Sequence, residues 1–434
     1  MLGIGPRGPT GREAPDAPPP GSLDAADDAR AAALTDLAQS ERDARVVLTS
    51  VRGRGPAGLG RLLRRFGDGR TVLAAADSPA GRRRIAASLR RGGSDESIDG
   101  PEEPAALGPD AIGIAAGIAA AEARHEEILD RVRSLGLAVV TVDEVGFPRR
   151  LRELELPPHL LFVRGDPAAL GARRTVAVVG TRRPTEYGRR VAGRIASAIG
   201  AAGGTVVSGL AIGIDGAAHG AAVAARVPTV AVIGGGHGHL FPRAHERLAE
   251  EIVATGGAVV AELFPDEAPT RGTFPRRNRL ISGLSEATIV IEAPARSGAL
   301  ITARWALEQG RDCYLVPGPI DAPASAGCLT FLHEHAGLAR LVATVPDLID
   351  DLGFGEAGPG SSSAGRLVEL GSVERRLVVA ISGGATTTDE LATALREPIA
   401  TILSGLTLLE MRGLVNETYG RYRLDGRLAG ASLA

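Results

Sequence analysis

The sequence predicts an α/β fold. A doubly wound, mostly parallel sheet is flanked by a small N-terminal helical domain and a C-terminal winged-helix domain. Six short apolar runs alternate with amphipathic stretches in the middle of the chain, a pattern typical of parallel strands joined by helices. Helical periodicity dominates the N-terminal part of the chain, and three helical patterns with a hairpin pattern follow the region of the six runs. The six runs cover residues 176–179, 205–208, 229–233, 258–261, 288–291 and 313–316.

The composition is that of a globular protein in a reducing compartment. With 434 residues, 44% of them hydrophobic, the chain has room for about three domains and a large core. All 49 basic residues are Arg, and the formal charge is −2, so a nucleic-acid partner would need Arg gathered on one face. Cys313 and Cys328 are too few for a disulfide framework or a zinc site.

No segment of the sequence has the pattern of a membrane anchor or a secretory signal. The N-terminus is rich in Pro, Gly, Asp and Ala and has no apolar core, unlike a signal peptide. The most apolar stretch, residues 111–121, is too short and too interrupted by Gly to span a bilayer. We therefore expect a cytoplasmic protein with no membrane partner.

The N-terminal third predicts a disordered segment, a helical domain and a linker. Residues 1–40 are of low complexity, 41–92 have helical spacing, and 93–120 are rich in Gly, Pro and acids. Within the helical domain, the Gly-rich turn at residues 52–58 resembles a helix-hairpin-helix whose amides bind a phosphate. A plain turn in a small bundle is the favoured interpretation, because only one hairpin is visible. The core is expected at residues 121–352, beginning with a helix near 122–135 and strands near 138–142 and 160–163.

The C-terminal region predicts a winged-helix domain at residues 369–427 after a linker at 353–368. Helical patterns cover residues 373–381, 388–395 and 399–411, and two short strands surround Gly420. Thr388 is the expected N-cap of the second helix. The third helix has almost no Arg with which to grip a major groove, which favours a structural or protein-contact role over duplex reading.

The candidate site lies where the strands of the sheet end. Ligands of such sheets bind beyond the carboxyl ends of the strands, and a helix N-terminus there attracts anions. Arg182 and Arg183 follow the first strand, where a dinucleotide-binding motif would need small residues. Guanidinium groups reach phosphates farther away than backbone amides do. The other candidate residues also lie in segments between a strand and a helix, so this edge is a predicted polyanion site. These residues are Gly180, Ser208, Gly209, Arg276, Asn278, Arg279, Arg296, Ser297 and Gly298.

Four motifs together resemble the DNA-processing protein A (DprA/Smf) family, in family order, over about residues 139–348. They are Gly180-Thr-Arg-Arg-Pro-Thr185 with Tyr187-Gly188, Ser208-Gly-Leu-Ala-Ile-Gly-Ile-Asp215 with Ala218-His219, Phe274-Pro-Arg-Arg-Asn-Arg279 with Gly283-Leu-Ser285, and Ser297-Gly-Ala-Leu-Ile-Thr-Ala303 with Val316-Pro-Gly318.

This resemblance implies a Rossmann-like core between a helical (helix-hairpin-helix or SAM-like) domain and a winged helix. It implies a non-enzymatic protein that binds single-stranded DNA, forms a homodimer, protects incoming strands and loads the RecA recombinase in natural transformation. By matching position, the strand-binding pocket would be lined by Arg182, Ser208, Gly209, Arg276, Asn278, Arg279, Ser297 and Gly298. Asn278 is expected to hold its loop or cap its helix rather than read a base.

The sequence departs from the family pattern in two places. Arg296 stands where many members have Lys, which keeps the charge but changes the hydrogen-bond geometry. The loop at residues 238–242 lacks the Asp that usually precedes its aromatic-Pro pair. Phe241 and Phe274 are candidates for base stacking, although core packing is the favoured interpretation for each alone.

Rival functions find weaker support. A nucleotide-binding or nucleotide-hydrolysing enzyme on a related fold is the main alternative, but no acid occurs between Ala293 and Leu307, where hydrolysis would require one. Asp215 and His219 have the spacing of an acid/base pair, though bracing of the helix is favoured. A metal site at His237, His239 and His245 has no fitting Cys or acid nearby beyond Glu246. We therefore expect no catalysis, cofactor or metal, and weak binding to duplex DNA. A pure scaffold would leave the Arg-bearing breaks unexplained.

Overall fold

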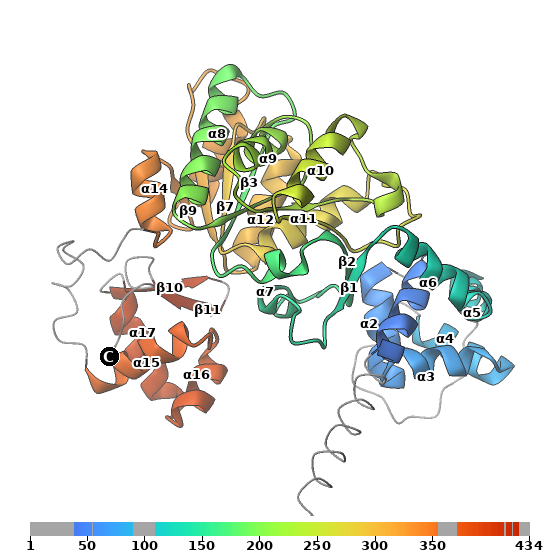
Figure 1. Cartoon of the computed structure of the whole chain (residues 1–434). Coiled ribbons are helices and arrows are strands. Elements are labelled where there is room, and N and C mark those ends of the chain that lie inside the picture. The colour runs from blue at the N-terminus through green and yellow to red at the C-terminus, as the bar shows by residue number, and fades with distance from the viewer. Residues whose placement is uncertain are drawn as a thin grey trace, which may run out of the picture.

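The computed structural model describes residues 39–53, 55–89, 109–354, 371–411, 414–418 and 420–424. Figure 1 shows an α/β core between a helical N-terminal domain and a small C-terminal domain. Disorder was expected for residues 1–40, of which only 39 and 40 are described, and both are helical. The parts of the expected linkers before residue 109 and at 355–368 lie outside the described residues. Among the described helices, none is long and apolar enough to cross a membrane.

The predicted sheet is present and mostly parallel. Within the described residues nine strands form one sheet in the order β1-β2-β6-β5-β4-β3-β7-β8-β9. The strands from β6 to β9 in this order run parallel, whereas β2 pairs antiparallel with both β6 and β1. Their bounds are β1 Ala138–Thr141, β2 Leu160–Gly165, β3 Thr175–Gly180, β4 Thr205–Ser208, β5 Thr229–Val232, β6 Ala258–Ala261, β7 Ala287–Ile291, β8 Asp312–Val316 and β9 Ala339–Leu341.

The six apolar runs became strands because both faces of the sheet are covered. Val206 packs toward one helical layer and its neighbour Val207 toward the other, since adjacent side chains on a strand point to opposite faces. Strand β9 was not predicted, because three residues carry too little pattern. One face is covered by α8 Glu186–Ala201, α9 Ile214–Ala224, α10 Glu246–Ala254 and α14 Val345–Asp351, and the other by α7 Arg149–Arg152, α11 Thr273–Leu284, α12 Gly298–Glu308 and α13 Ala326–Glu334.

The N-terminal helical domain extends farther along the chain than the sequence predicted. Helix α5 occupies much of the segment that was expected to be a linker, because its Ala and Ile side chains pack against the other helices. The helix expected at 122–135 begins only at His125. The domain consists of helical residues 39–50 with α2 Gly55–Phe66, α3 Gly69–Ala76, α4 Pro79–Ser88, α5 Pro109–Glu122 and α6 His125–Ser134.

The C-terminal domain has the predicted three helices and hairpin. Its elements are α15 Ser372–Ser382, α16 Thr388–Leu395, α17 Ile399–Met411, β10 Val415–Thr418 and β11 Arg421–Leu424. The N-cap of α16 is Thr387 rather than Thr388. Thr387 and Glu390 form a reciprocal capping box, in which each side chain accepts a hydrogen bond from the other residue's amide. The cap therefore lies one residue before the predicted position, while the helix itself covers the predicted range, Thr388–Leu395.

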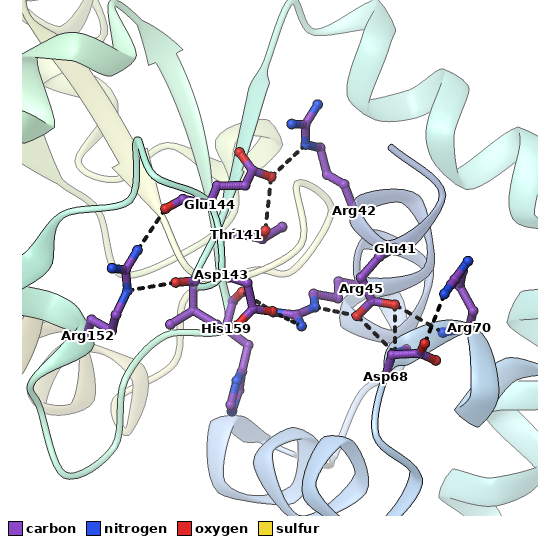
Figure 2. Close-up of polar contacts among 12 residues, drawn as sticks. Glu41, Arg42, Arg45, Asp68, Arg70, Thr141, Asp143, Glu144, Arg152 and His159 are labelled. Atoms are coloured by element: carbon purple, nitrogen blue, oxygen red, sulfur yellow. Dashed lines mark hydrogen bonds and ion pairs between the residues drawn. The ribbon is translucent and has the colours of Figure 1, made fainter. Parts of the chain in front are cut away.

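A buried Arg joins the helical domain to the core, as Figure 2 shows. Arg45 is 5% exposed. Its Nε donates to Glu41 at 2.7 Å, while its Nη atoms donate to Asp143 and to the carbonyl of His159. Glu41 also accepts hydrogen bonds from the amide of Gly69, at the start of α3. This network sets the position of the helical domain relative to the end of β1.

Candidate nucleic-acid interface

The strand ends converge at one edge of the sheet, as predicted. The Thr181 amide donates to the Glu292 carbonyl at 2.7 Å, which joins the turns after β3 and β7. The Ile214 amide, at the start of α9, donates to the Thr181 carbonyl at 3.2 Å. Asn278 of α11 donates to the Gly298 carbonyl of α12 at 3.1 Å. Loops that are far apart in sequence therefore form one connected surface.

The turn after β3 is anchored from behind and presents two free Arg side chains. The Thr185 amide donates to Glu292 at 2.8 Å, and the Thr185 hydroxyl donates to the same carboxylate. Arg182 and Arg183 are both exposed, and no described hydrogen bond or ion pair involves their guanidinium groups. Because the backbone is fixed and the charges are unpaired, the turn is suited to binding an anion.

The turn after β4 is buried, and its polar groups already have partners. The Ser208 hydroxyl donates to the Val178 carbonyl at 2.6 Å, and the Gly209 amide donates to Asp215 at 3.1 Å. Because Asp215 accepts from the Gly209 amide, this amide is not available to a phosphate. The two residues shape the floor of the edge. A Cβ on Gly209 would lie 2.8 Å from both Arg277 and Asp215, so only glycine fits.

Helix α11 begins at Thr273, so its Arg cluster lies inside the helix and not ahead of it. Arg276 is exposed, whereas the next three side chains are buried. Asn278 holds α12, as expected for a loop-holding residue. Arg279 is 5% exposed and donates to Glu262 at 2.5 Å, while its Nη1 has no described hydrogen-bond partner. Arg276 is therefore the exposed cation of this cluster, whereas the three residues after it hold other parts of the structure in place.

Arg277, which sequence reasoning left out of the site, lies at its centre. Its guanidinium donates to the carbonyls of Gly209 and Val232, which end β4 and its neighbour β5. Burial lowers the pKa of Arg277 to about 10, and the nearby Asp215 carboxylate opposes that shift, so the group stays charged at neutral pH. Burial raises the pKa of Asp215, and Arg277 opposes that shift. The sequence signal was present, since Arg277 adjoins two predicted site residues.

The turn before α12 adds one more exposed cation. Arg296 is exposed, and no described polar contact involves its guanidinium. Ser297 caps α12, its side chain accepting from the Ala299 amide at 3.3 Å. Gly298 is exposed at the first position of the helix. The N-terminus of α12 and Arg296 together favour negative charge at this corner.

Two Phe side chains lie beside these cations. Phe241 is 50% exposed, so the favoured interpretation of core packing is wrong for this residue. Its ring centroid lies 5.9 Å from that of Phe274, which is partly buried. The guanidinium of Arg182 lies 5.6 Å from the Phe274 ring centroid. Apolar ring faces next to free guanidinium groups match the needs of a single-stranded nucleic acid.

The rival catalytic and metal sites find no support among the described residues. His219 is fully buried, with Nδ1 2.9 Å from the Thr229 hydroxyl, and does not pair with Asp215. Burial lowers the pKa of His219 to about 3, so it is neutral. His237 and His245 each contact a backbone carbonyl. The described part of the chain contains no group of three potential metal ligands.

Comparisons with known proteins agree with this architecture. A family model for DNA recombination-mediator protein A matches residues 138–353, and one for the DprA winged helix domain matches residues 362–421. DNA processing protein DprA of Bacillus subtilis is 37% identical over 225 residues, which are 52% of this chain and 74% of that protein. The putative DNA processing protein DprA of Mycobacterium tuberculosis is 40% identical over 294 residues, covering 67% and 74%.

A solved structure is similar over a larger part of the chain. The X-ray structure of DNA processing protein A from Streptococcus pneumoniae aligns with a TM-score of 0.54 and 28% identity, covering 71% of this chain and 96% of that one. The C-terminal helices and hairpin are therefore a winged-helix domain of this type. With a matched core, a matched winged helix and a relative that is 40% identical over 74% of its length, the chain belongs to the DNA-processing protein A (DprA/Smf) family.

Proposed function

We propose that this protein binds single-stranded DNA through its phosphates at the carboxyl edge of the sheet, without preference for base sequence. The observation that carries this proposal is a set of exposed guanidinium groups with no described hydrogen bond or ion pair at the strand ends, one of which, that of Arg182, lies over the Phe274 ring. At this edge these groups belong to Arg182, Arg183, Arg276 and Arg296.

A strand fits this edge better than a duplex does. The exposed Arg at this edge lie on turns or at helix ends beside a buried floor that includes Gly209 and Arg277, whereas duplex readers place one face of a helix along the major groove. An unstacked strand can place phosphates on the guanidinium groups and a base against Phe241. Because phosphate contacts dominate, binding is expected to be independent of sequence and to weaken with salt.

The cellular role follows from the family. Its core model describes a recombination mediator, and we infer that this chain protects captured strands and delivers them to the RecA recombinase, as a cytoplasmic homodimer, in DNA recombination or natural transformation. A mediator needs no catalytic group, and the two acid/base candidates, Asp215 and His219, are bound internally. The proposal is therefore one of binding and delivery.

The test is fluorescence anisotropy with a labelled oligothymidine and a matched duplex, at low salt. The wild type should bind the single strand much more tightly than the duplex. An Arg182→Ala, Arg183→Ala variant should lose most of this binding. An Arg189→Ala, Arg194→Ala variant, which removes two exposed charges from α8, the helix that follows this turn, should bind like the wild type. Equal binding of strand and duplex, or no binding, would refute the proposal and favour a nucleotide-handling protein.

A further inference from the structure

A large cavity separates the helical domain from the core and was not part of the predicted site. Its volume is about 1000 Å³, at the upper end of the range for small-molecule sites. One wall comes from residues 49–53 and α2, the other from α11, α12 and the segment after β6. Its cationic lining residues are Arg52, Arg61, Arg276 and Arg279, its acidic ones Asp110, Glu262 and Glu267, and it also includes Trp305.

Two positive groups face each other across this cavity. Helix α2 begins at Gly55 and has no acidic residue in its first turn, so the positive end of its dipole is not balanced from within the helix. The Nη2 atom of Arg276 lies 3.3 Å from the position that a Cβ on Gly55 would take. A cation at a helix N-terminus is electrostatically unfavourable unless an anion lies close to both. This juxtaposition points to an anion site.

The surrounding charges support the same conclusion. Arg52 is exposed, and no described hydrogen bond or ion pair involves its guanidinium. Arg61 donates only to the carbonyls of Ser88 and Leu89, which leaves its charge unneutralised. Arg279, more than nine-tenths buried at the cavity wall, has a guanidinium nitrogen with no described partner. Glu262 is already paired with Arg279, so it offsets less of the positive charge than its presence suggests.

Helix α11 connects the cavity to the sheet edge. Phe274 and Arg276 are two residues apart in its first turn. Phe274 lies under Arg182 of the sheet edge, and Arg276 lies against Gly55 of the helical domain. Residues two apart in a helix point to opposite sides of it. A strand that lies on Arg182 must therefore pass around the N-terminal end of α11, across a helix about 10 Å in diameter, to reach the cavity.

We propose that the cavity between the helical domain and the core binds a nucleotide of the strand captured at the sheet edge. Its phosphate lies between Arg276 and the N-terminus of α2, and its base packs on the apolar wall that includes Trp305 and Leu59. This inference rests on the proposed function, because the strand must first be captured at Arg182 and Arg183. It gives the helical domain a direct part in DNA binding, which the Gly-rich turn suggested only weakly in the sequence.

Trp305 is the only Trp of the chain, so its fluorescence reports on the cavity alone. The experiment titrates the full-length protein with oligothymidines of about 4 to about 16 nucleotides, the range of site sizes for single-strand binders, and separately with thymidine monophosphate. Anisotropy of a labelled strand measures affinity in parallel. We expect the short strands to bind without changing the Trp305 signal, and the long strands to bind more tightly and to change it.

Three variants separate this proposal from the function on which it rests. Arg52→Glu should lose only the gain in affinity with strand length, about tenfold for one charged contact. Arg83→Glu, the same charge change at an exposed α4 position away from the cavity, should keep that gain. Arg182→Ala, Arg183→Ala should lose binding at every length, which tests the sheet edge independently.

Two outcomes would overturn the proposal while leaving the sheet-edge function intact. In the first, long strands bind tightly but leave the Trp305 fluorescence unchanged, and the Arg52→Glu variant keeps the full gain in affinity with strand length. In the second, thymidine monophosphate changes the Trp305 signal and long strands do not, which would make the cavity a site for free nucleotides.

Discussion

Arg277 and Asp215 hold opposite sides of the same peptide turn: the guanidinium donates to the Gly209 carbonyl at 2.8 Å, and the carboxylate accepts from the Gly209 amide at 3.1 Å. Both side chains are almost completely buried, at 8% and 6% exposure. They come from α11 and α9, so the pair connects two helices on opposite faces of the sheet through the end of β4. The exposed Arg of the candidate site are therefore supported by a buried charge pair.

Removing one member of this pair should be costly. An Arg277→Met variant leaves Asp215 buried without a compensating charge, and its free energy of unfolding should fall by about 3–5 kcal/mol. Urea denaturation measures the change. Arg276→Met, at the exposed neighbouring position, should change stability by no more than about 0.5 kcal/mol. An Arg277→Met, Asp215→Asn double variant should recover part of the loss, and failure to recover any would show that Arg277 acts through its backbone contacts alone.

The salt dependence of DNA binding should reveal how many phosphates the first turn contacts. Each neutralised phosphate of a single strand contributes about 0.7 to the slope of log affinity against log salt. If Arg182 and Arg183 each contact one phosphate, the Arg182→Ala, Arg183→Ala variant should have a slope shallower by about 1.4. Anisotropy titrations at several salt concentrations give the slope. An unchanged slope with weaker binding would mean that the two Arg act without contacting phosphate.

Glu292 should keep the turn that contains Arg182 and Arg183 well ordered. Its backbone φ is +50°, and it accepts from both the amide and the hydroxyl of Thr185. Glu292→Ala keeps the Cβ and the same backbone strain but removes the acceptor, so stability should fall by about 1–3 kcal/mol. Amide exchange at residues 181–185 should accelerate, and single-strand affinity should fall. Glu186→Ala, on the exposed first turn of α8, is the matched control. Unaltered exchange in Glu292→Ala would contradict this role.

The buried His side chains should make the protein less stable as pH falls below neutral. Burial lowers the pKa of His219 to about 3 and that of His237 to about 4, from a usual value of 6.5. Below pH 6.5 the unfolded chain binds these protons and the folded chain does not. Stability that is present above pH 6.5 is therefore lost as pH falls toward the folded-state values, by up to about 1.4 kcal/mol per pH unit for each His. Denaturation midpoints between pH 7.5 and 5 test this, and a flat profile would refute it.

The helical domain should depend on Arg45 for its position. Arg45→Met removes the hydrogen bonds to Glu41, Asp143 and His159 at once, and we expect a loss of about 1–3 kcal/mol because buried partners lose their donor. Arg42→Met removes two contacts that are more exposed, to Glu144 and to Gln39, and should cost much less. Calorimetry measures both. If the cavity binds a nucleotide, Arg45→Met should also reduce the gain in affinity with strand length, because the two walls no longer keep their spacing.

Local patterns determined most of the architecture. The six apolar runs are strands because alternation with amphipathic stretches is encoded within a few residues, and the helices of the winged domain follow from spacing and capping. Helix α5 escaped this reasoning, since Gly113 and Gly117 interrupt its apolar run and its burial depends on α4. Trp305 gave no signal as a site residue, because its place in the interdomain cavity depends on how the two domains dock.

The sequence by itself determined where the Arg residues lie along the chain and that they gather at the strand ends. Only the tertiary structure decided which of them are free. Arg276, Arg277 and Arg279 are nearly adjacent, yet the first is exposed, the second holds Gly209, and the third is paired with Glu262. The reason is physical: the free charge of an Arg depends on the acids and carbonyls that reach it from distant elements. Sequence spacing does not contain those distances.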